Sequence, residues 1–484
     1  MRPISRRKFV RGSATGAFAL GLAPSILSAG RQSDELRVAI VGIRSRGRSH
    51  INGFHGLKGV RVSALCDVDS KVLAREAKAF TDRGESVETF TDLRKLLEKG
   101  GVDIISIATP NHWHALQTIW ACQAGMDVYV EKPVSHNVFE GRQMVAAARK
   151  YGRIVQTGTQ SRSSPSLAAA VKWVHEGHIG KITTSRGLCY KPRQSIGHVS
   201  GPQGIPDHID YDLWTGPAPM EPLMRRDLHY DWHWDFATGN GDLGNQGIHQ
   251  MDICRWFLGE SKLAPEVFAV GGRFGYADDG NTTNTASIVH AYAGAPLVFE
   301  VRGLPKDAES QASNWGKNMD SFMGSRIGCI IHCQNGHVVV PSYTAATAFG
   351  SDGEKLQEWK GGGDHFANFI QAVRARDASL LNADIAEGHI SSALCHVGNI
   401  SYLAGRAATL EDVQASVGDG AGRNALDRMQ KHLVDNGIDL GSDRMTLGRH
   451  LSIDPATESI LGDDLAQAMM TRNYRAPFVV HEIS

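Results

Sequence analysis

The chain has 484 residues, of which 42% are hydrophobic and 21% charged, a composition typical of soluble globular proteins and not of disordered ones. Because 51 basic residues balance 51 acidic ones, the formal net charge is zero and gives no electrostatic support for binding to nucleic acid or to an anionic membrane. Seven cysteines, an odd number, do not indicate a disulfide framework. The chain is longer than a domain with a single hydrophobic core usually is, so its length predicts two domains.

The amino terminus carries a basic segment followed by a weakly apolar one. Residues 5–9 read Ser-Arg-Arg-Lys-Phe, and the uncharged stretch 12–30 that follows is interrupted by Pro24 and ends in Ser28-Ala29-Gly30. This order resembles a cleavable twin-arginine export signal; the alternative is an uncleaved amphipathic N-terminus. No apolar run reaches the roughly 18–20 residues that a membrane-spanning helix needs. We therefore expect residues 1–33 to direct the folded protein to the periplasm through the twin-arginine translocase.

From residue 34 to residue 159, short apolar runs alternate with helical patterns, which is typical of a parallel sheet wrapped by helices. The pattern predicts strands over 36–41, 60–66, 102–108, 127–130 and 154–157. It predicts helices over 69–80, 93–99, 113–124 and 139–151. The fold class expected is therefore α/β, with an N-terminal Rossmann dinucleotide-binding domain.

Residues 160–484 have a different texture and predict an α+β domain for substrate binding and oligomerisation. Strand-like runs at 181–190, 266–274, 285–301 and 327–340 are spaced too widely for simple βαβ units and favour an open, largely antiparallel sheet. Between the first two runs lies a long aromatic-rich segment, 197–244, without clear periodicity, which is typical of a functional loop. Helices are predicted over 364–376 and 384–407, and the tail from about residue 409 reads as mixed helix and loop.

A glycine turn follows the first predicted strand directly: Gly42-Ile43-Arg44-Ser45-Arg46-Gly47. Its first and last glycines stand where a dinucleotide-binding turn needs a tight bend and close packing of helix on strand. The middle position is Arg44 and not glycine, so the backbone cannot approach a pyrophosphate there in the usual way. Arginine side chains at 44, 46 and 48 are the candidates to hold the phosphates, together with the helix N-terminal amides.

The second predicted strand ends in Cys66-Asp67. An acidic side chain at this place accepts hydrogen bonds from the adenosine ribose hydroxyls. It would also repel a 2′-phosphate, so we expect NAD as the cofactor in preference to NADP. The alternative is a doubly wound fold that binds no nucleotide.

Two further segments end predicted strands at the same edge of the sheet, where open parallel sheets bind their ligands. They are Thr109-Pro110-Asn111-His112-Trp113-His114 and Glu131-Lys132-Pro133. Hydride transfer from an alcohol requires a group that takes the hydroxyl proton, and a lysine does so if burial and nearby cations lower its pKa. Without this context, a solvated surface charge is the ordinary explanation of a single lysine.

The sequence resembles the glucose-fructose oxidoreductase / inositol dehydrogenase (Gfo/Idh/MocA) family over most of its length. The resemblance rests on the glycine turn, on Thr109-Pro110-Asn111 with His114, on Glu131-Lys132-Pro133, and on segment 241–252, Gly-Asp-Leu-Gly-Asn-Gln-Gly-Ile-His-Gln-Met-Asp. It implies that Lys132 and His249 are the catalytic pair. It also implies a homo-oligomer, dimer or tetramer, built on the open sheet of the second domain.

The family pattern implies further binding residues. The cofactor set is Gly42, Ile43, Arg44, Arg46, Gly47, Asp67, Thr109, Asn111, His114, Glu131 and Gln160. Gln160 and Arg162 match positions near the nicotinamide end or the substrate, although a loop hydrogen bond explains each equally well. We assign Arg162 to substrate binding.

Asn245 departs from the family pattern, because many relatives carry aspartate four residues before the histidine. Asparagine still hydrogen-bonds a sugar hydroxyl but does not accept a proton as a carboxylate does. The proton relay would then depend on Lys132 and His249, with Asp242 and Asp252 as candidates for a compensating carboxylate.

Residues 225–235 mix aromatic faces with hydrogen-bonding groups, a combination that suits a sugar. We therefore assign Trp232 and His233, with Asn245 and His249, to carbohydrate binding. The pair His229 and His233 has a spacing that metal sites use, but no helix is predicted there and a sugar cleft explains the histidines as well. We expect no metal.

Three functions follow in order of preference. The first is an NAD-dependent oxidoreductase that acts on a sugar, cyclitol or glycoside hydroxyl with a tightly bound cofactor, since free nicotinamide cofactor is not expected outside the cytoplasm. The second is a redox-assisted glycoside hydrolase, in which a transient keto-sugar permits elimination and the hydride then returns. The third is a sugar-binding protein without catalysis, suggested by Arg44 and Asn245.

Overall fold

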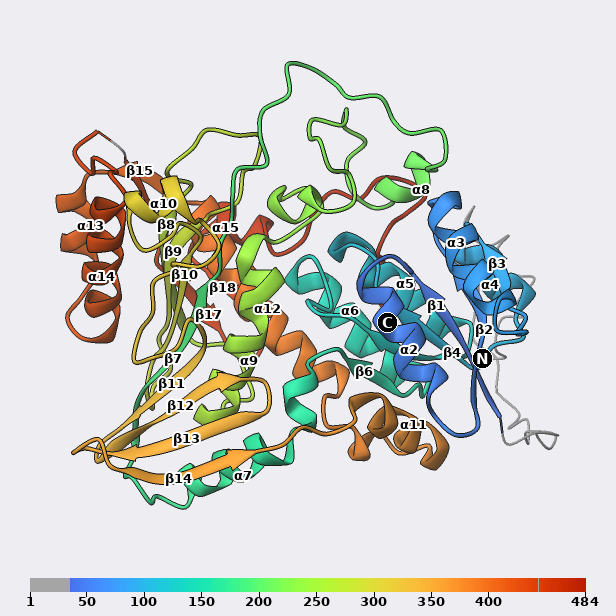
Figure 1. Ribbon diagram of the computed structural model, residues 1–484, viewed down its shortest axis with the longest axis horizontal. Coiled ribbons are helices and arrows are strands. Elements are labelled where there is room, and N and C mark those ends of the chain that lie inside the picture. Colours follow the sequence, from blue (N-terminus) through green and yellow to red (C-terminus); the bar gives the residue numbers. More distant parts are fainter. Residues whose placement is uncertain (1–34, 443) are drawn as a thin grey trace.

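The structure is a computed structural model that describes residues 35–442 and 444–484. The expected export signal at residues 1–33 lies outside the described residues. Two sheets organise the chain: the first lies among the blue and teal helices of Figure 1, and the second among the green, yellow and orange elements. The expected pairing of a Rossmann-like parallel sheet with a second domain built on a mixed sheet is confirmed.

The first sheet has six parallel strands in the order β3-β2-β1-β4-β5-β6, the Rossmann order. The strands are β1 (Leu36–Val41), β2 (Val60–Cys66), β3 (Glu88–Phe90), β4 (Ile104–Ile107), β5 (Asp127–Val130) and β6 (Val155–Thr157). The helices that connect them are α2 (Arg46–His55), α3 (Ser70–Thr81), α4 (Leu93–Lys99), α5 (Asn111–Gln123) and α6 (Val138–Lys150).

Both faces of this sheet are buried, which is why its central strands read as continuous apolar runs. In β1, Val38 and Ile40 face a core that includes Phe54 of α2. Ala39 and Val41 face the opposite core, which α4, α5 and α6 complete. The burial of alternate residues on two sides follows from the period of two along a strand.

The predicted strands and helices of this region agree closely with the structure, apart from one shorter strand and one strand that was not predicted. The strands 36–41, 60–66 and 127–130 and the helix 93–99 have the predicted bounds. The strand predicted over 102–108 is shorter, Ile104–Ile107, and no strand was predicted at Glu88–Phe90. This short edge strand has no apolar alternation, because its first two residues are exposed.

The second sheet has twelve strands in the described part of the chain. Ten follow the order β14-β13-β12-β11-β7-β10-β9-β8-β16-β15, β17 also pairs with β8, and β18 pairs with β17. They are β7 (Ile182–Tyr190), β8 (Glu266–Gly272), β9 (Thr285–His290), β10 (Leu297–Arg302), β11 (Ile327–Cys333), β12 (Gly336–Ser342), β13 (Ala345–Gly350), β14 (Lys355–Lys360), β15 (Arg406–Ala408), β16 (Met445–Leu447), β17 (Leu451–Asp454) and β18 (Ser459–Leu461). All neighbours are antiparallel except β7 and β10, which are parallel.

Two of the predicted strand runs in this domain are hairpins. The run 285–301 divides into β9 and β10, and the run 327–340 divides into β11 and β12, which the two-residue turn Gln334-Asn335 joins. Strands β13 and β14 were not predicted. The expectation of helix up to residue 407, followed by helix and loop alone, was wrong in part, because β15 to β18 add four short strands there.

Helices cover both faces of the second sheet. On one face, α7 (Pro165–His175), α9 (Ile248–Leu258) and α12 (Ile385–Leu403) contribute to the largest apolar core. On the other, α13 (Leu410–Ser416) and α14 (Ala421–Asp435) pack over β8. The remaining helices are α8 (Tyr211–Thr215), α10 (Ala308–Ser313), α11 (His365–Ala375) and α15 (Asp464–Ala468), with short helical turns at Gln160–Ser163, Asp231–Trp234, Leu243–Gly247 and Ala378–Leu380.

Segments far along the chain return to the first sheet. Phe369 and Val373 of α11 belong to the core beneath α2, and Phe478 and Val480 near the C-terminus belong to the core beneath α5. Helix α12 packs against α6 as well as against β8. The two sheets are therefore joined by shared packing, and the cleft between them has well-supported walls.

Some groups that sequence reasoning considered are placed by the structure. All seven cysteines lie in the described part of the chain, and each is buried and free of disulfide bonds. No group of three or more His, Cys, Asp or Glu side chains among residues 35–442 and 444–484 is arranged to hold a metal ion. None of the helices described there is both long enough and apolar enough to span a bilayer.

Candidate active site

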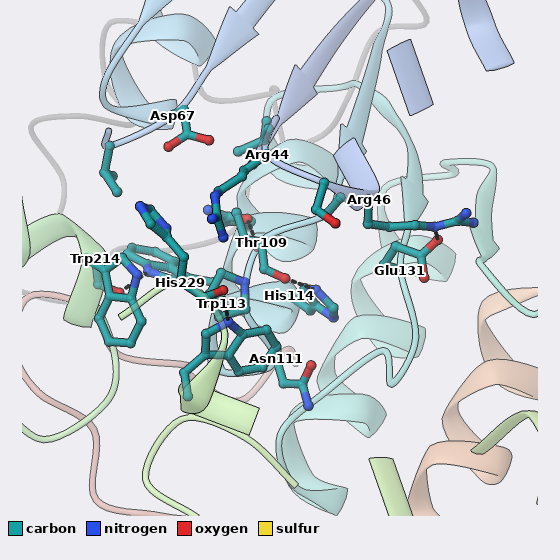
Figure 2. Close-up of a pocket in the computed structure, with 18 of the residues that line it drawn as sticks. Arg44, Arg46, Asp67, Thr109, Asn111, Trp113, His114, Glu131, Trp214 and His229 are labelled. Carbon is teal, nitrogen blue, oxygen red and sulfur yellow. Dashed lines mark hydrogen bonds and ion pairs between the residues drawn. The ribbon is translucent and has the colours of Figure 1, made fainter. Parts of the chain in front are cut away.

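A cavity of about 460 Å³ opens at the carboxyl ends of β1, β2, β4 and β5, and residues of the second domain close its other side. Figure 2 shows part of its lining. The volume is within the usual range for small-molecule sites. Its position outside the strand ends is the one at which open α/β sheets bind their ligands.

The glycine turn forms one end of the cavity, and its shape requires glycine at both outer positions. Gly42 has a φ of +76°, and a β-carbon there would lie 2.7 Å from the amide nitrogen of Thr109. A β-carbon on Gly47 would lie 1.9 Å from the carbonyl oxygen of Gly42. Ser45 carries the unusual backbone of the turn, with a φ of +49°, and no side chain caps the N-terminus of α2. In the first turn of α2 the amides of Gly47 and Arg48 already donate to the carbonyl oxygens of Arg44 and Ser45, over 3.2 and 3.1 Å. Among the described residues, the amides of Ser45 and Arg46 are therefore the ones left for an anion.

The arginines of the turn point in different directions. Arg44 is exposed and lines the cavity, whereas Arg46 turns to Glu131 and donates from Nε to Oε1 over 2.7 Å (Figure 2). Arg46 is thus an ion-pair partner of Glu131. Arg48, the third candidate for phosphate binding, pairs with Glu76 outside the cavity. Gly47 and the buried Ile43 do not line the cavity, and they act by shaping the turn.

Asp67 closes the same end of the cavity. Its Oδ2 accepts from the amide of Ile43 over 2.9 Å, and its Oδ1 accepts from the amide of Asp69 over 2.9 Å. Burial raises the pKa of this carboxyl against the lowering effect of the two amides. Each oxygen keeps a lone pair for a further donor such as a ribose hydroxyl.

The segment after β4 provides the floor of the cavity. The hydroxyl of Thr109 donates to Gln117 over 2.8 Å, and the Asn111 amide donates to the side chain of Asn240 over 3.0 Å. His114 lines the cavity, but its Nδ1 lies 2.6 Å from the carbonyl oxygen of Pro133 and its Nε2 lies 2.7 Å from that of Thr109. Because both ring nitrogens have protein partners, His114 holds the two strand-end loops together and offers no ring nitrogen to a ligand.

Glu131 is a buried carboxylate with several donors around it. Arg46, His50 at 3.0 Å and Gln160 at 3.4 Å all contact its Oε1. Burial alone would raise the pKa of this carboxyl, but Arg46 and His50 outweigh it and the pKa is held well below its usual value. Glu131 is therefore a fixed negative charge beside Lys132.

Lys132 reaches from the end of β5 across the cavity to the second domain. Its Nζ donates to the backbone carbonyl oxygen of Asn245 over 2.6 Å. Burial lowers the pKa of the Lys132 ammonium; Glu131 opposes this effect, while Arg46 and Lys191 add to it. The lysine expected to take a proton is thus enclosed and near other cations, as that role requires.

His249 enters the cavity from α9, immediately after a π-helical turn at Leu243–Gly247, and such turns are frequent at functional sites. Its Nδ1 is buried and has no hydrogen-bond partner among the described residues. Burial, and then the charge of Lys132, lowers the pKa of the imidazole to about 3. His249 is therefore neutral near pH 7. The ring of Tyr343 lies 4.7 Å from that of His249, centroid to centroid.

Neither candidate for a compensating carboxylate reaches the cavity. Asp252 accepts from Arg162 over 2.8 Å, and Asp242 accepts from Arg193 over 2.5 Å. Among the described residues that line the cavity, Asp67, Asp92 and Glu131 are the carboxylates, and Glu131 is ion-paired. The cavity wall near Lys132, His249 and Asn245 thus contains no unpaired carboxylate.

The predicted substrate residues divide into two groups. Trp232 and His233 line the cavity with their rings stacked 3.7 Å apart between centroids. Burial lowers the pKa of His233 to about 3. The substrate role of Arg162 stays a prediction: its guanidinium is ion-paired with Asp252 and Glu387, and it is not among the residues that line the cavity.

Sequence reasoning missed several lining residues. They are Ser45, Trp113, Gln117, Trp120, Leu213, Trp214, His229, Tyr230 and Tyr343. The aromatic-rich composition of segment 197–244 could have pointed to the lining residues Leu213, Trp214, His229 and Tyr230. Tyr343 had no such signal, since it lies in the turn between β12 and β13 and reaches the cavity only through the fold of the second sheet.

Comparison with known proteins agrees with this arrangement. Residues 36–159 match the Gfo/Idh/MocA oxidoreductase family with its NAD-binding Rossmann fold, and residues 171–322 match the C-terminal alpha/beta domain of the same oxidoreductase family. The chain belongs to this family. The resemblance seen in the sequence and the expectation of an NAD-binding domain are both confirmed.

Curated relatives match over part of their length. A glycosyl hydrolase family 109 protein of Saccharopolyspora erythraea is 29% identical over 209 residues, which cover 38% of this chain and 45% of the relative. The levoglucosan dehydrogenase of Pseudarthrobacter phenanthrenivorans is 26% identical over 239 residues, which cover 48% of this chain and 54% of the relative. The chain thus spans about half the length of these relatives.

Solved structures share the fold. Levoglucosan dehydrogenase in complex with NADH and levoglucosan has a TM-score of 0.55 at 17% identity, with 75% of this chain and 95% of that one covered. The WlbA dehydrogenase from Bordetella pertussis, in complex with NADH and UDP-GlcNAcA, has a TM-score of 0.54 at 19% identity, with 74% and 94% covered. At these identities the likeness establishes the two-domain architecture.

Proposed function

We propose that the protein is an NAD-dependent oxidoreductase that acts on a hydroxyl group of a sugar, cyclitol or glycoside. One observation carries the proposal: Lys132 at the end of β5 and His249 on α9 line the same cavity, and the Lys132 Nζ is fixed 2.6 Å from the Asn245 carbonyl oxygen. The membership in an oxidoreductase family supports it, and so do the sugar dehydrogenases among the relatives.

The residues of the first domain fit a dinucleotide. The uncapped N-terminus of α2 offers amides to the pyrophosphate, Arg44 adds a positive charge, and Asp67 has acceptor capacity left for ribose hydroxyls. The buried carboxylate of Asp67 would repel a 2′-phosphate, which favours NAD over NADP. When bound, NAD supplies the acceptor for the hydride that leaves the substrate carbon.

Lys132 is the group that takes the hydroxyl proton. Its lowered pKa increases the fraction of neutral amine at a given pH, and the Asn245 carbonyl oxygen orients the Nζ. His249 is neutral beside it, and its unpartnered Nδ1 is free to hydrogen-bond the substrate or to relay the proton.

Aromatic side chains form the proposed sugar site. Tyr230, Trp232, His233 and Tyr343 line the cavity, and the Tyr343 ring lies 4.7 Å from that of His249. Their faces suit the C–H surface of a sugar ring, and Asn245 is placed to hydrogen-bond a hydroxyl.

The replacement Lys132→Met tests the assignment. The variant should keep its bound NAD, because Lys132 is not among the groups that hold the phosphates or the ribose, and it should lose sugar-dependent reduction of the cofactor. Lys95→Met, at an exposed lysine of α4, is the matched control and should react like the unchanged protein. If the Lys132 variant reduced its cofactor at the normal rate, the proposed function would be wrong. Tight sugar binding without any redox change in the unchanged protein would instead favour a non-catalytic sugar-binding protein.

A second candidate, a redox-assisted glycoside hydrolase, is favoured by the lack of an unpaired carboxylate near Lys132 and by the glycosyl hydrolase family 109 relatives. Oxidation of a ring hydroxyl to a ketone would acidify the neighbouring C–H, and loss of that proton would expel the glycosidic substituent. Water would then add to the alkene, and the stored hydride would return to the ketone. Aryl glycosides separate the candidates: release of the aryl alcohol over many turnovers without added NAD indicates the hydrolase, whereas NADH accumulation matching product indicates the dehydrogenase.

We also propose export to the periplasm through the twin-arginine translocase, with NAD already bound. The basic segment at residues 5–9 supports this, and so does the burial of seven unpaired cysteines, which suits folding in a reducing compartment. Replacing both Arg6 and Arg7 with lysine should leave the protein in the cytoplasm. Fractionation with an unchanged periplasmic distribution would contradict the proposal.

A homo-oligomer, dimer or tetramer, completes the proposal. Strands β12 and β13 keep half-exposed apolar residues, Val339 and Phe349, on the sheet face opposite the main core. Light scattering on the purified protein tests this, and the mass of a single chain would contradict it.

A further inference from the structure

One long segment of the second domain crosses to the nucleotide end of the cavity. Residues 205–236, here called the strap, lie between β7 and α9 in the chain and contain α8. In Figure 1 the green chain arches away from the second sheet and brings α8 beside α3. The strap thus leaves its own domain and lies against the first one.

The first attachment of the strap is at the start of α3. The amide of Ser70 donates to the carbonyl oxygen of His208 over 2.9 Å, and the amide of Asp210 donates to that of Val68 over 3.1 Å. The side chain of Val68 also packs into the strap's own apolar cluster: Ile209, Trp214, Leu223, Leu228 and Trp232. Val68, the residue that follows Asp67, therefore forms part of the strap's apolar cluster.

A second attachment joins the strap to α5 and to the C-terminal segment. Trp113 Nε1 donates to the carbonyl oxygen of Leu213 over 2.9 Å. Arg475 donates from Nε to the carbonyl oxygen of Gly216 over 2.9 Å and from a terminal nitrogen to Asp212 over 2.6 Å. The backbone of the strap lies so close to α5 that a β-carbon on Gly216 would be 2.2 Å from the Trp113 ring.

Between these attachments the strap is a wall of the cavity. Leu213, Trp214 and His229 line it together with Asp67. Figure 2 shows Trp214 and His229 on the same side of the cavity as Asp67. His229 is held there by Asp69, whose Oδ2 lies 2.9 Å from its Nε2. Asp67 marks the ribose of the adenosine half, so these side chains from the second domain face the adenosine site.

We propose that the strap completes the binding site for the adenosine half of NAD and retains the cofactor between turnovers. This inference rests on the proposed function, since it takes NAD as the ligand. Dissociation of NAD would require the strap to move away from both α3 and α5. This movement would break backbone hydrogen bonds, an ion pair and an apolar cluster together. The bound cofactor then exchanges slowly with free NAD.

Two substitutions loosen the strap without removing a residue that lines the cavity. Gly216→Ala forces the strap away from Trp113, and Arg475→Gln removes the ion pair with Asp212. Gly204→Ala is the matched control, because a β-carbon at Gly204 meets no atom within 4 Å. Each protein is loaded with radiolabelled NAD, freed of excess ligand, and followed for loss of label after addition of unlabelled NAD.

The unchanged protein and Gly204→Ala should hold the label through gel filtration. Gly216→Ala and Arg475→Gln should release it about tenfold faster or more, the factor expected when one hydrogen bond to a charged group is lost. Equal release rates in all four proteins, or complete exchange in the unchanged protein within seconds, would overturn the proposal. Circular dichroism and thermal unfolding show whether each variant is folded. If the variants do not fold, the exchange rate of the unchanged protein still tests the proposal.

This test is independent of turnover. Rapid exchange combined with sugar-dependent reduction of added NAD would refute the strap and leave the proposed function standing. Slow exchange of NAD with no redox response to any sugar would refute the proposed function and leave the role of the strap standing.

Discussion

Replacing Gly47 with alanine should damage both stability and NAD binding, because the new β-carbon has no room. It would lie 1.9 Å from the carbonyl oxygen of Gly42 and 2.8 Å from the carbonyl carbon. Both are backbone atoms, so no side-chain rotation relieves the clash, and α2 must move away from the end of β1. Overpacking of this kind costs about 1–3 kcal/mol. The N-terminal amides of α2 move with the helix, so a comparable loss in binding energy would weaken NAD binding by about tenfold to hundredfold.

Gly56, at the C-terminal end of the same helix, supplies a control of opposite sign. Its φ is −77°, and a β-carbon there would meet only the carbonyl oxygen of Asn52 at 3.7 Å. Alanine fits this backbone and should stabilise the protein by about 0.4–1 kcal/mol by restricting the unfolded chain. Urea unfolding and calorimetric titration with NAD, both on protein stripped of cofactor by mild denaturation and refolding, measure the two effects. If the Gly47 and Gly56 variants matched each other in stability and in NAD affinity, the steric account of the turn would be refuted.

Two other changes test the catalytic lysine and the packing beneath the cofactor. The charge of Lys191 adds to the effect of burial in lowering the pKa of Lys132. Lys191→Gln should therefore raise that pKa and move the rising limb of the pH profile of kcat/KM to higher pH. Lys191→Arg keeps the charge, so an equal shift in the Lys191→Arg variant would contradict this explanation. Phe478 is buried against Trp113 at 5.3 Å between ring centroids, so Phe478→Ala should lower the free energy of unfolding by about 3–5 kcal/mol. Denaturant unfolding measures the loss, with the half-exposed Leu465→Ala as a control that should change stability by no more than about 0.5 kcal/mol.

The first domain was predictable because its signals are local. Strands buried on both faces give apolar runs, as at 38–41 in β1 and 128–130 in β5, and the helices between them show their own period. The strand ends then bring the glycine turn, Asp67 and Glu131-Lys132 to one edge by topology alone. The edge strand β3 escaped prediction because its residues carry no burial pattern.

The sequence did not give the partners of site side chains where long-range contacts decide them. Arg46 and Arg44 are equivalent in the sequence of the turn, and only the buried Glu131 selects one of them as an ion-pair partner. The sequence around Arg162 likewise gives no sign of its ion pair with Asp252, which lies far along the chain. Tyr343 reaches the cavity only because the hairpin of β12 and β13 is placed there by the second sheet.

The hydrogen bond of Lys132 bears on which reaction the site performs. Its partner is the backbone carbonyl of Asn245, which accepts a hydrogen bond but does not take a proton at neutral pH. A proton that Lys132 removes from a hydroxyl therefore stays on the lysine unless His249 passes it on. In a net oxidation the proton must leave the cavity in every cycle, so His249 is needed as the exit. In a redox-neutral cycle Lys132 returns the proton to the same oxygen when the hydride comes back. Since no unpaired carboxylate lies beside this enclosed lysine among the described residues, the site suits a reaction in which proton and hydride are both restored to the substrate.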